Sequence, residues 1–152
     1  MEEMPHQGGG MSLGSLMAEM AFATAGTAAV HALAYPLGGE FNIPHGEANT
    51  VMLKSVMEFD RDRCAKKTSR LARAVSMERL NMSDEEASEY LTEWMTGTAR
   101  RIGVTIRIRD LGVPEDAIPT MADAASRKAR LLSNNPKTIN REDIDKIYRR
   151  AW

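Results

Sequence analysis

The sequence is short of the residue types that most often mark a site of chemistry. Its 152 residues include one cysteine and three histidines, aromatic residues make up 5%, and the formal net charge is −1. A lone cysteine, Cys64, excludes an internal disulfide and is typical of a reducing compartment, so we expect a cytoplasmic protein. The balanced charge gives no indication of a nucleic-acid or membrane-surface partner. No glycine-rich turn follows a predicted strand, so the usual dinucleotide-binding device is not predicted.

The composition that remains is that of a helical globular protein. Hydrophobic residues make up 43% of the chain, charged residues 27%, and there are eleven methionines. This length corresponds to one domain with a real core, and many methionines with few aromatics favour an adaptable helical core over a β-sandwich. Residues 1–10 end in a glycine run, and we expect them to be a flexible leader without regular structure. Residues 11–152 then form the helical domain.

Apolar residues recur at spacings of three and four along most of the chain, which predicts helices. Pro36 should end the first helix, because proline disfavours helical backbone at Tyr35 and lacks a backbone donor. Ser83 and Glu86 have the spacing of a capping box, and Asn140 is placed to cap the last helix. No strand pair is predicted, so the fold class is all-α, a bundle of five or six helices. We expect helices over residues 12–35, 45–58, 61–75, 83–103, 118–132 and 141–151.

The segment from Met11 to Leu37 is apolar and long enough to cross a membrane. It contains Glu19 and His31, however, and its apolar residues are mainly alanine, glycine and methionine rather than leucine and isoleucine. We therefore expect a buried, tightly packed helix of a soluble protein.

Two of the three histidines, His31 and His45, flank a Pro-Leu-Gly-Gly turn. A helix, a tight reversal and a second helix would bring both imidazoles to one side of that turn, and Tyr35 lies one helical turn after His31. Imidazole is the commonest protein ligand for transition metals. Judged on spacing alone, the pair is a weak signal, and hydrogen-bonded core or surface histidines are the more common case, because metal centres usually need three or more protein ligands.

The stretch AFATAGTAAVHALAYPLGGEFNIPHGEAN resembles the signature of the iron-containing (group III) alcohol dehydrogenases. The likeness continues through RDLGVPEDAIPTMADAA, the Asn-Pro-Lys loop and the terminal DIDKIYRRAW. It covers residues 11–152, nearly the whole chain. The resemblance implies the helical C-terminal domain of such an enzyme, whose N-terminal α/β domain binds NAD or NADP.

In that family one aspartate and three histidines hold a divalent metal, Fe²⁺ or Zn²⁺. The resemblance assigns His31 and His45 to the last two of these ligands and Phe22 to a position beside the nicotinamide. Tyr35 stands where many members have another histidine, so it is implied as a variant residue of the substrate pocket. The other two ligands belong to a segment upstream of this chain, and we expect the N-terminal nucleotide-binding domain to be absent.

Two functions therefore remain open. The chain is either the C-terminal part of a metal-dependent, NAD(P)-linked alcohol dehydrogenase, or a non-catalytic truncated helical module or split-enzyme subunit. In the first case the intact enzyme would act on a small alcohol or aldehyde. The chain would then work either with a partner N-terminal half or as a homo-oligomer. In either case the chain alone is expected to be inactive, because half of the metal ligands and the cofactor domain lie elsewhere.

Overall fold

Helices make up the regular structure, as the apolar periodicity predicts. The computed structural model describes residues 7–76 and 81–152, and no strand occurs among them, which confirms the all-α class. The seven α-helices are α1 (Gln7–Ala25), α2 (Ala29–Phe41), α3 (His45–Val75), α4 (Asp84–Arg101), α5 (Ile118–Ser126), α6 (Ala129–Leu132) and α7 (Arg141–Ala151). Two short 3₁₀ turns, η2 (Ile108–Leu111) and η3 (Glu115–Ala117), lie between α4 and α5.

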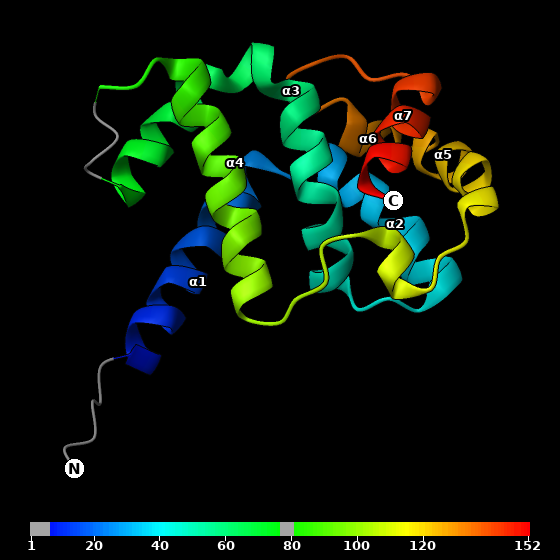
Figure 1. Ribbon diagram of the computed structural model, residues 1–152, viewed down its shortest axis with the longest axis horizontal. Helices are drawn as coiled ribbons and strands as arrows, with labels where there is room; N and C mark the ends of the chain where they lie inside the picture. The colour runs from blue at the N-terminus through cyan, green and yellow to red at the C-terminus, as the bar shows by residue number, and fades with distance from the viewer. Residues whose placement is uncertain (1–6, 77–80) are drawn as a thin grey trace.

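The long helix α3 is the central helix of the fold. Helix α4 packs along it, and α2 and α7 pack on its N-terminal half (Figure 1). The expected break between residues 58 and 61 is wrong, because α3 runs unbroken for 31 residues. At 1.5 Å per residue that is roughly 46 Å. Neither proline nor glycine occurs between Glu47 and Val75, and the charged side chains there are exposed or half-buried except for Asp60, which is buried.

The main core lies between α2, the first half of α3, α5 and α7. Its largest fully buried side chains come from all four helices and from η2: Tyr148, Leu33, Leu37, Met52, Ile108, Ile118, Met121 and Ile144. A smaller cluster around Ala72, Ala87 and Leu91 joins the second half of α3 to α4. The core therefore encloses α2, which carries His31 and Tyr35.

The first predicted helix is two helices. The chain leaves α1 at Gly26, whose φ of +73° is the left-handed conformation that favours glycine, and re-enters helix at Ala29 with a bend of 104°. No single helix in the described ranges is long and apolar enough to cross a membrane, and α1 and α2 pass such a test only as this bent pair. The expectation of one buried helix is correct for α2 and wrong for α1, whose residues are exposed from Gly9 to Ala25.

Helix α2 also continues past Pro36, contrary to expectation. Pro36 is buried inside the helix, which ends instead at Asn42, in the left-handed conformation with φ +54°. Burial of Leu33 and Leu37 on either side offsets the one hydrogen bond that proline removes. The tight reversal after α2 is therefore shorter than the predicted loop, which began at Leu37.

The termini of the other helices follow local signals. Both reciprocal hydrogen bonds of the Ser83–Glu86 capping box form at the start of α4, and Asn140 caps α7 with Asp143 in the same way. The predicted fifth helix is split into α5 and α6. The glycine run before Met11 is helical from Gly8 onward, since α1 begins at Gln7, so the expected lack of regular structure is wrong there. Residues 1–6 of the predicted leader lie outside the described residues.

Candidate metal and cofactor site

The structure brings His31 and His45 together at one end of the molecule. His31 lies in the first turn of α2, and His45 is the first residue of α3, directly after Pro44. The reversal at Asn42, with the Ile43 amide donating to the Leu37 carbonyl at 3.3 Å, folds α3 back toward α2. The two imidazole centroids are 5.2 Å apart. The juxtaposition expected from the sequence is therefore present, while the role of the two rings as ligands stays a prediction.

The two other residues singled out from the sequence flank this pair on opposite sides. The Phe22 ring lies 5.9 Å from the His31 ring, and the Tyr35 ring lies 6.3 Å from the His45 ring. Phe22 and Tyr35 are each 48% exposed, so both rings present a free surface. Lys128, which the sequence did not single out, places its ammonium nitrogen 5.4 Å from the centroid of the Tyr35 ring.

The surroundings of the His31 ring favour its neutral form. Burial lowers the pKa of His31 from its ordinary value, and the nearby His45 lowers it further. Asn49, one turn after His45, has its amide nitrogen 2.9 Å from His45 Nε2. A ring nitrogen that accepts this bond is unprotonated, and its lone pair is then occupied by the Asn49 amide, so a metal ion at Nε2 would have to displace Asn49. Asn49 was missed at the sequence level, although its i,i+4 spacing from His45 gave a signal.

These donors fit part of a metal site and not the whole of one. Two imidazole nitrogens on one side of a turn suit Zn²⁺ or Fe²⁺. Within residues 7–76 and 81–152, however, no group of three or more histidine, cysteine, aspartate or glutamate side chains is placed to hold a metal ion. An ion at His31 and His45 would therefore need further ligands from outside these residues.

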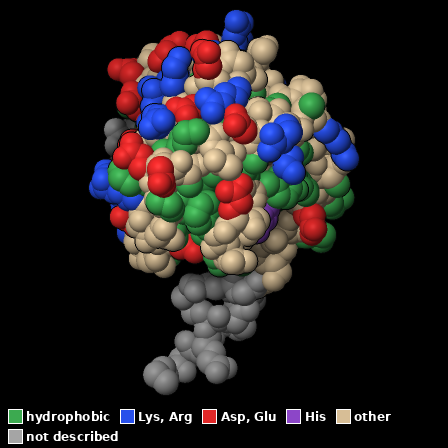
Figure 2. All heavy atoms as spheres, turned by 90° about the vertical axis from the view of Figure 1, so that its right-hand side faces the viewer, with side chains coloured by type: hydrophobic (Ala, Val, Ile, Leu, Met, Phe, Trp, Pro, Cys, Tyr) green, Lys and Arg blue, Asp and Glu red, His purple; other side chains and the backbone are tan. Residues whose placement is uncertain are grey.

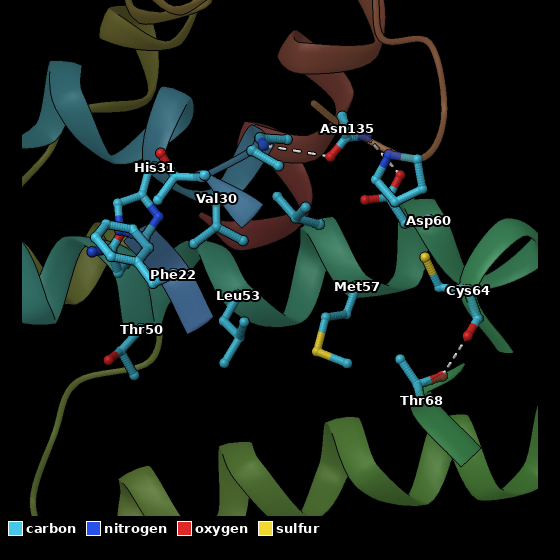
Figure 3. A pocket seen from close by; sticks show the side chains of 17 residues that line it. Phe22, Val30, His31, Thr50, Leu53, Met57, Asp60, Cys64, Thr68 and Asn135 are labelled. Carbon is cyan, nitrogen blue, oxygen red and sulfur yellow. Dashed lines mark hydrogen bonds between the residues drawn. The ribbon is translucent and has the colours of Figure 1, made fainter. Parts of the chain in front are cut away.

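An apolar pocket of about 490 Å³ opens beside His31. Figure 3 shows that Phe22 and His31 stand at one end and that Leu53, Met57 and Cys64 of α3 continue the wall away from them. Asp60 and Asn135 lie at the far side. His45 and Tyr35 are outside this pocket; Tyr35 lines a separate one of about 220 Å³ with Lys128 and Glu40. Burial raises the pKa of the Cys64 thiol, which makes it a poor nucleophile.

Helix α1 projects from the body of the molecule (Figure 1), and its apolar side chains are exposed. Six large hydrophobic residues of α1 are at least 48% exposed: Met11, Leu13, Leu16, Met17, Met20 and Phe22. On the face shown in Figure 2, acidic and basic groups lie among hydrophobic ones.

Comparison with known proteins agrees with the fold. Residues 4–152 match the C-terminal domain of the Fe-containing alcohol dehydrogenase family. The chain is 37% identical over 142 residues to long-chain-alcohol dehydrogenase 1 of Geobacillus thermodenitrificans and 36% identical over 142 residues to lactaldehyde reductase of Escherichia coli, covering 93% of this chain in each case. An alcohol dehydrogenase structure from Oenococcus oeni superimposes with a TM-score of 0.83 at 30% identity, over 89% of this chain.

The chain belongs to the Fe-containing alcohol dehydrogenase family and corresponds to its C-terminal domain. It spans only about a third of the proteins it matches: 36% of the Geobacillus enzyme, 37% of the Escherichia reductase and 35% of the Oenococcus structure. The two-histidine site and the uncovered α1 are therefore features of a domain whose relatives are much longer.

Proposed function

We propose that this chain supplies the C-terminal, metal-binding part of a dehydrogenase that interconverts alcohols with aldehydes or ketones by using NAD or NADP. The observation that carries the proposal is the approach of His31 and His45 to 5.2 Å across a tight turn. Membership of the Fe-containing alcohol dehydrogenase family supports the role of this pair of nitrogen donors as metal ligands.

In this proposal His31 and His45 hold a divalent ion, Fe²⁺ or Zn²⁺, through their unprotonated ring nitrogens. Such an ion supplies Lewis-acid polarisation of the alcohol or carbonyl oxygen. His31 is suited to this role because its lowered pKa reduces competition from protons at neutral pH. Asn49 contacts His45 Nε2 at 2.9 Å, so an ion bound at that nitrogen would displace the Asn49 amide.

Phe22 and Tyr35 form the walls on either side of the pair. The Phe22 ring beside His31 offers an apolar surface for the nicotinamide and excludes water from it. The Tyr35 phenol lines the substrate side, near the ammonium group of Lys128. A phenol with an ordinary pKa near 10 is a weaker proton shuttle at neutral pH than an imidazole, so we assign Tyr35 to substrate contact.

The remaining metal ligands and the nucleotide-binding domain come from an N-terminal part, either within a longer polypeptide or as a separate chain. Three observations support this partner: among the described residues the site has only two candidate ligands, the apolar pocket beside it is open, and the apolar residues of α1 are exposed. The chain covers about a third of its relatives. We expect the complete enzyme to work in the cytoplasm, either with this N-terminal part as a partner or as a homo-oligomer.

A second candidate function is a non-catalytic helical module. The absence of a third ligand among the described residues favours it, because two imidazoles alone bind a divalent ion weakly. In that case the uncovered α1 would promote association with a second copy of the chain.

Complementation separates the two candidates. The chain is mixed with a separately produced N-terminal half of the Escherichia lactaldehyde reductase, and both Zn²⁺ or Fe²⁺ content and NAD(P)H-linked aldehyde reduction are measured. The dehydrogenase proposal predicts metal and activity in the mixture, with both lost in His31→Ala and kept in His6→Ala, which carries the same chemical change at a position with no proposed role. A mixture that forms a stable complex yet holds no metal and shows no turnover supports the non-catalytic module.

A further inference from the structure

The direction of α1 is set at the break between α1 and α2 rather than by packing along α1. No described helix makes an extensive contact with α1, and its side chains are exposed. Phe22 nevertheless lies over His31, which is on the other side of the break. Whatever fixes the 104° bend therefore also fixes the position of the Phe22 ring.

The loop after α6 holds this bend from a distant part of the sequence. The Asn134 side chain donates to the Thr27 carbonyl at 3.1 Å, inside the break. A Cβ atom at Gly26 would lie 2.8 Å from the amide nitrogen of Asn134, so this side chain sits directly against the Gly26 backbone. A side chain at this position would displace the Asn134 amide, in addition to being strained by the φ of +73°.

Asn135 acts on the other end of the break. The first amides of a helix have no partner within the helix, and Ala28, the N-cap of α2, has no side chain that could supply one. The amide of Ala29 donates instead to Asn135 Oδ1 at 3.4 Å, across 106 residues of sequence. Asn135 thus serves as a long-range cap for the helix that carries His31.

Asp60 orients the Asn135 amide. Asn135 Nδ2 donates to Asp60 Oδ1 at 2.8 Å and to the Lys137 carbonyl at 2.9 Å. Asp60 lies on α3 and is only 7% exposed. With both amide hydrogens directed this way, the Asn135 oxygen must face Ala29. One side chain therefore ties the start of α2 to the middle of α3 (Figure 3).

We propose that Asn134 and Asn135 are positioning residues of the candidate site, which hold the α1–α2 break so that Phe22 covers His31. Asp60 supports them by orienting Asn135. The importance of this arrangement for catalysis rests on the proposed function, but the ring contact itself does not. It can be measured in the metal-free chain without any enzyme activity.

The test is NMR spectroscopy of the full 152-residue chain. The chain has three histidines and three phenylalanines, so selective labelling resolves the contact between the Phe22 ring and the His31 Cε1 proton. Phe22→Ala provides the His31 chemical shift without the ring. Asn135→Ala is expected to remove the contact and to move the His31 resonance at least half of the way to the Phe22→Ala position, with a smaller displacement in Asn134→Ala.

Two further variants separate positioning from stability. Asp60→Asn keeps an oxygen acceptor for Asn135 and should retain the contact, whereas Asp60→Ala should weaken it. Asn140→Ala is the matched control, since it removes an asparagine cap from α7 and should lower thermal stability without moving the His31 resonance. If Asn135→Ala and Asn134→Ala lower the melting temperature as Asn140→Ala does but leave the Phe22–His31 contact intact, the proposal is wrong. Failure of the complementation experiment would leave this result unaffected.

Discussion

The hydrogen bond between Tyr148 and Leu33 gives a quantitative test of how α2 is held in place. Tyr148 on α7 is completely buried, and its hydroxyl donates to the Leu33 carbonyl at 2.6 Å across 115 residues of sequence. Leu33 lies between His31 and Tyr35 on α2, so this bond fixes the helix that carries two of the proposed site residues. We expect Tyr148→Phe to remove the bond while keeping the packing of the ring.

The expected cost is about 1 kcal/mol of unfolding free energy. A buried hydrogen bond contributes a net ~0.5–1.5 kcal/mol, and an acceptor left without any partner costs ~1–3 kcal/mol. The Leu33 carbonyl lies inside α2, where the helix offers it a backbone donor as well. It is therefore not left without a partner, and the range of ~0.5–1.5 kcal/mol for a net hydrogen bond applies. For a chain of this size, 1 kcal/mol corresponds to a fall of roughly 2–4 °C in melting temperature. Tyr148→Ala would also open a cavity and should cost ~3–5 kcal/mol.

Urea denaturation followed by circular dichroism measures both variants. Burial raises the pKa of Tyr148 well above its usual range, so the phenol stays protonated in the folded state. Unfolded tyrosine ionises near 10, and the cost of Tyr148→Phe should therefore be constant between about pH 6 and pH 9.

Tyr35→Phe is the matched control, because it makes the same change at a half-exposed ring on α2 and should alter stability by less than about 0.5 kcal/mol. A loss in Tyr148→Phe no larger than in this control would refute the hydrogen bond as a stabilising contact. A loss as large as in Tyr148→Ala would refute the assumption that the ring packing survives.

Three other predictions concern the capping box, the helix break and the buried acid. Ser83→Ala removes the cap of α4 and should cost about 1 kcal/mol in urea denaturation. Gly26→Ala forces a side chain into left-handed backbone against Asn134 and should cost at least ~1 kcal/mol, whereas Gly97→Ala, in open space inside α4, should be neutral or stabilising. Burial raises the pKa of Asp60, so its charge opposes folding increasingly as the pH rises above the ordinary value near 4. Asp60→Asn should therefore raise the melting temperature, relative to wild type, more at pH 7 than at pH 3, and an equal change at both would contradict this sign.

Helix ends that depend on neighbours in the sequence could be predicted correctly. The caps at Ser83 and Asn140 join residues three positions apart, so the sequence contains the whole interaction. The approach of His31 and His45 across the turn between them could also be predicted from the local sequence, whereas the end of α2 could not, because Pro36 stays inside the helix.

The sequence by itself determined that the chain is all-α, which helices carry caps, and that two histidines face each other across a turn. These features follow from periodicity and from contacts between residues that are close in the chain. Only the tertiary structure decided that Pro36 stays inside a helix, that α1 turns away at Gly26, and that Asn135 caps α2 from 106 residues away. Burial and long-range hydrogen bonds stabilise these three features, and neither can be read from a local stretch of sequence.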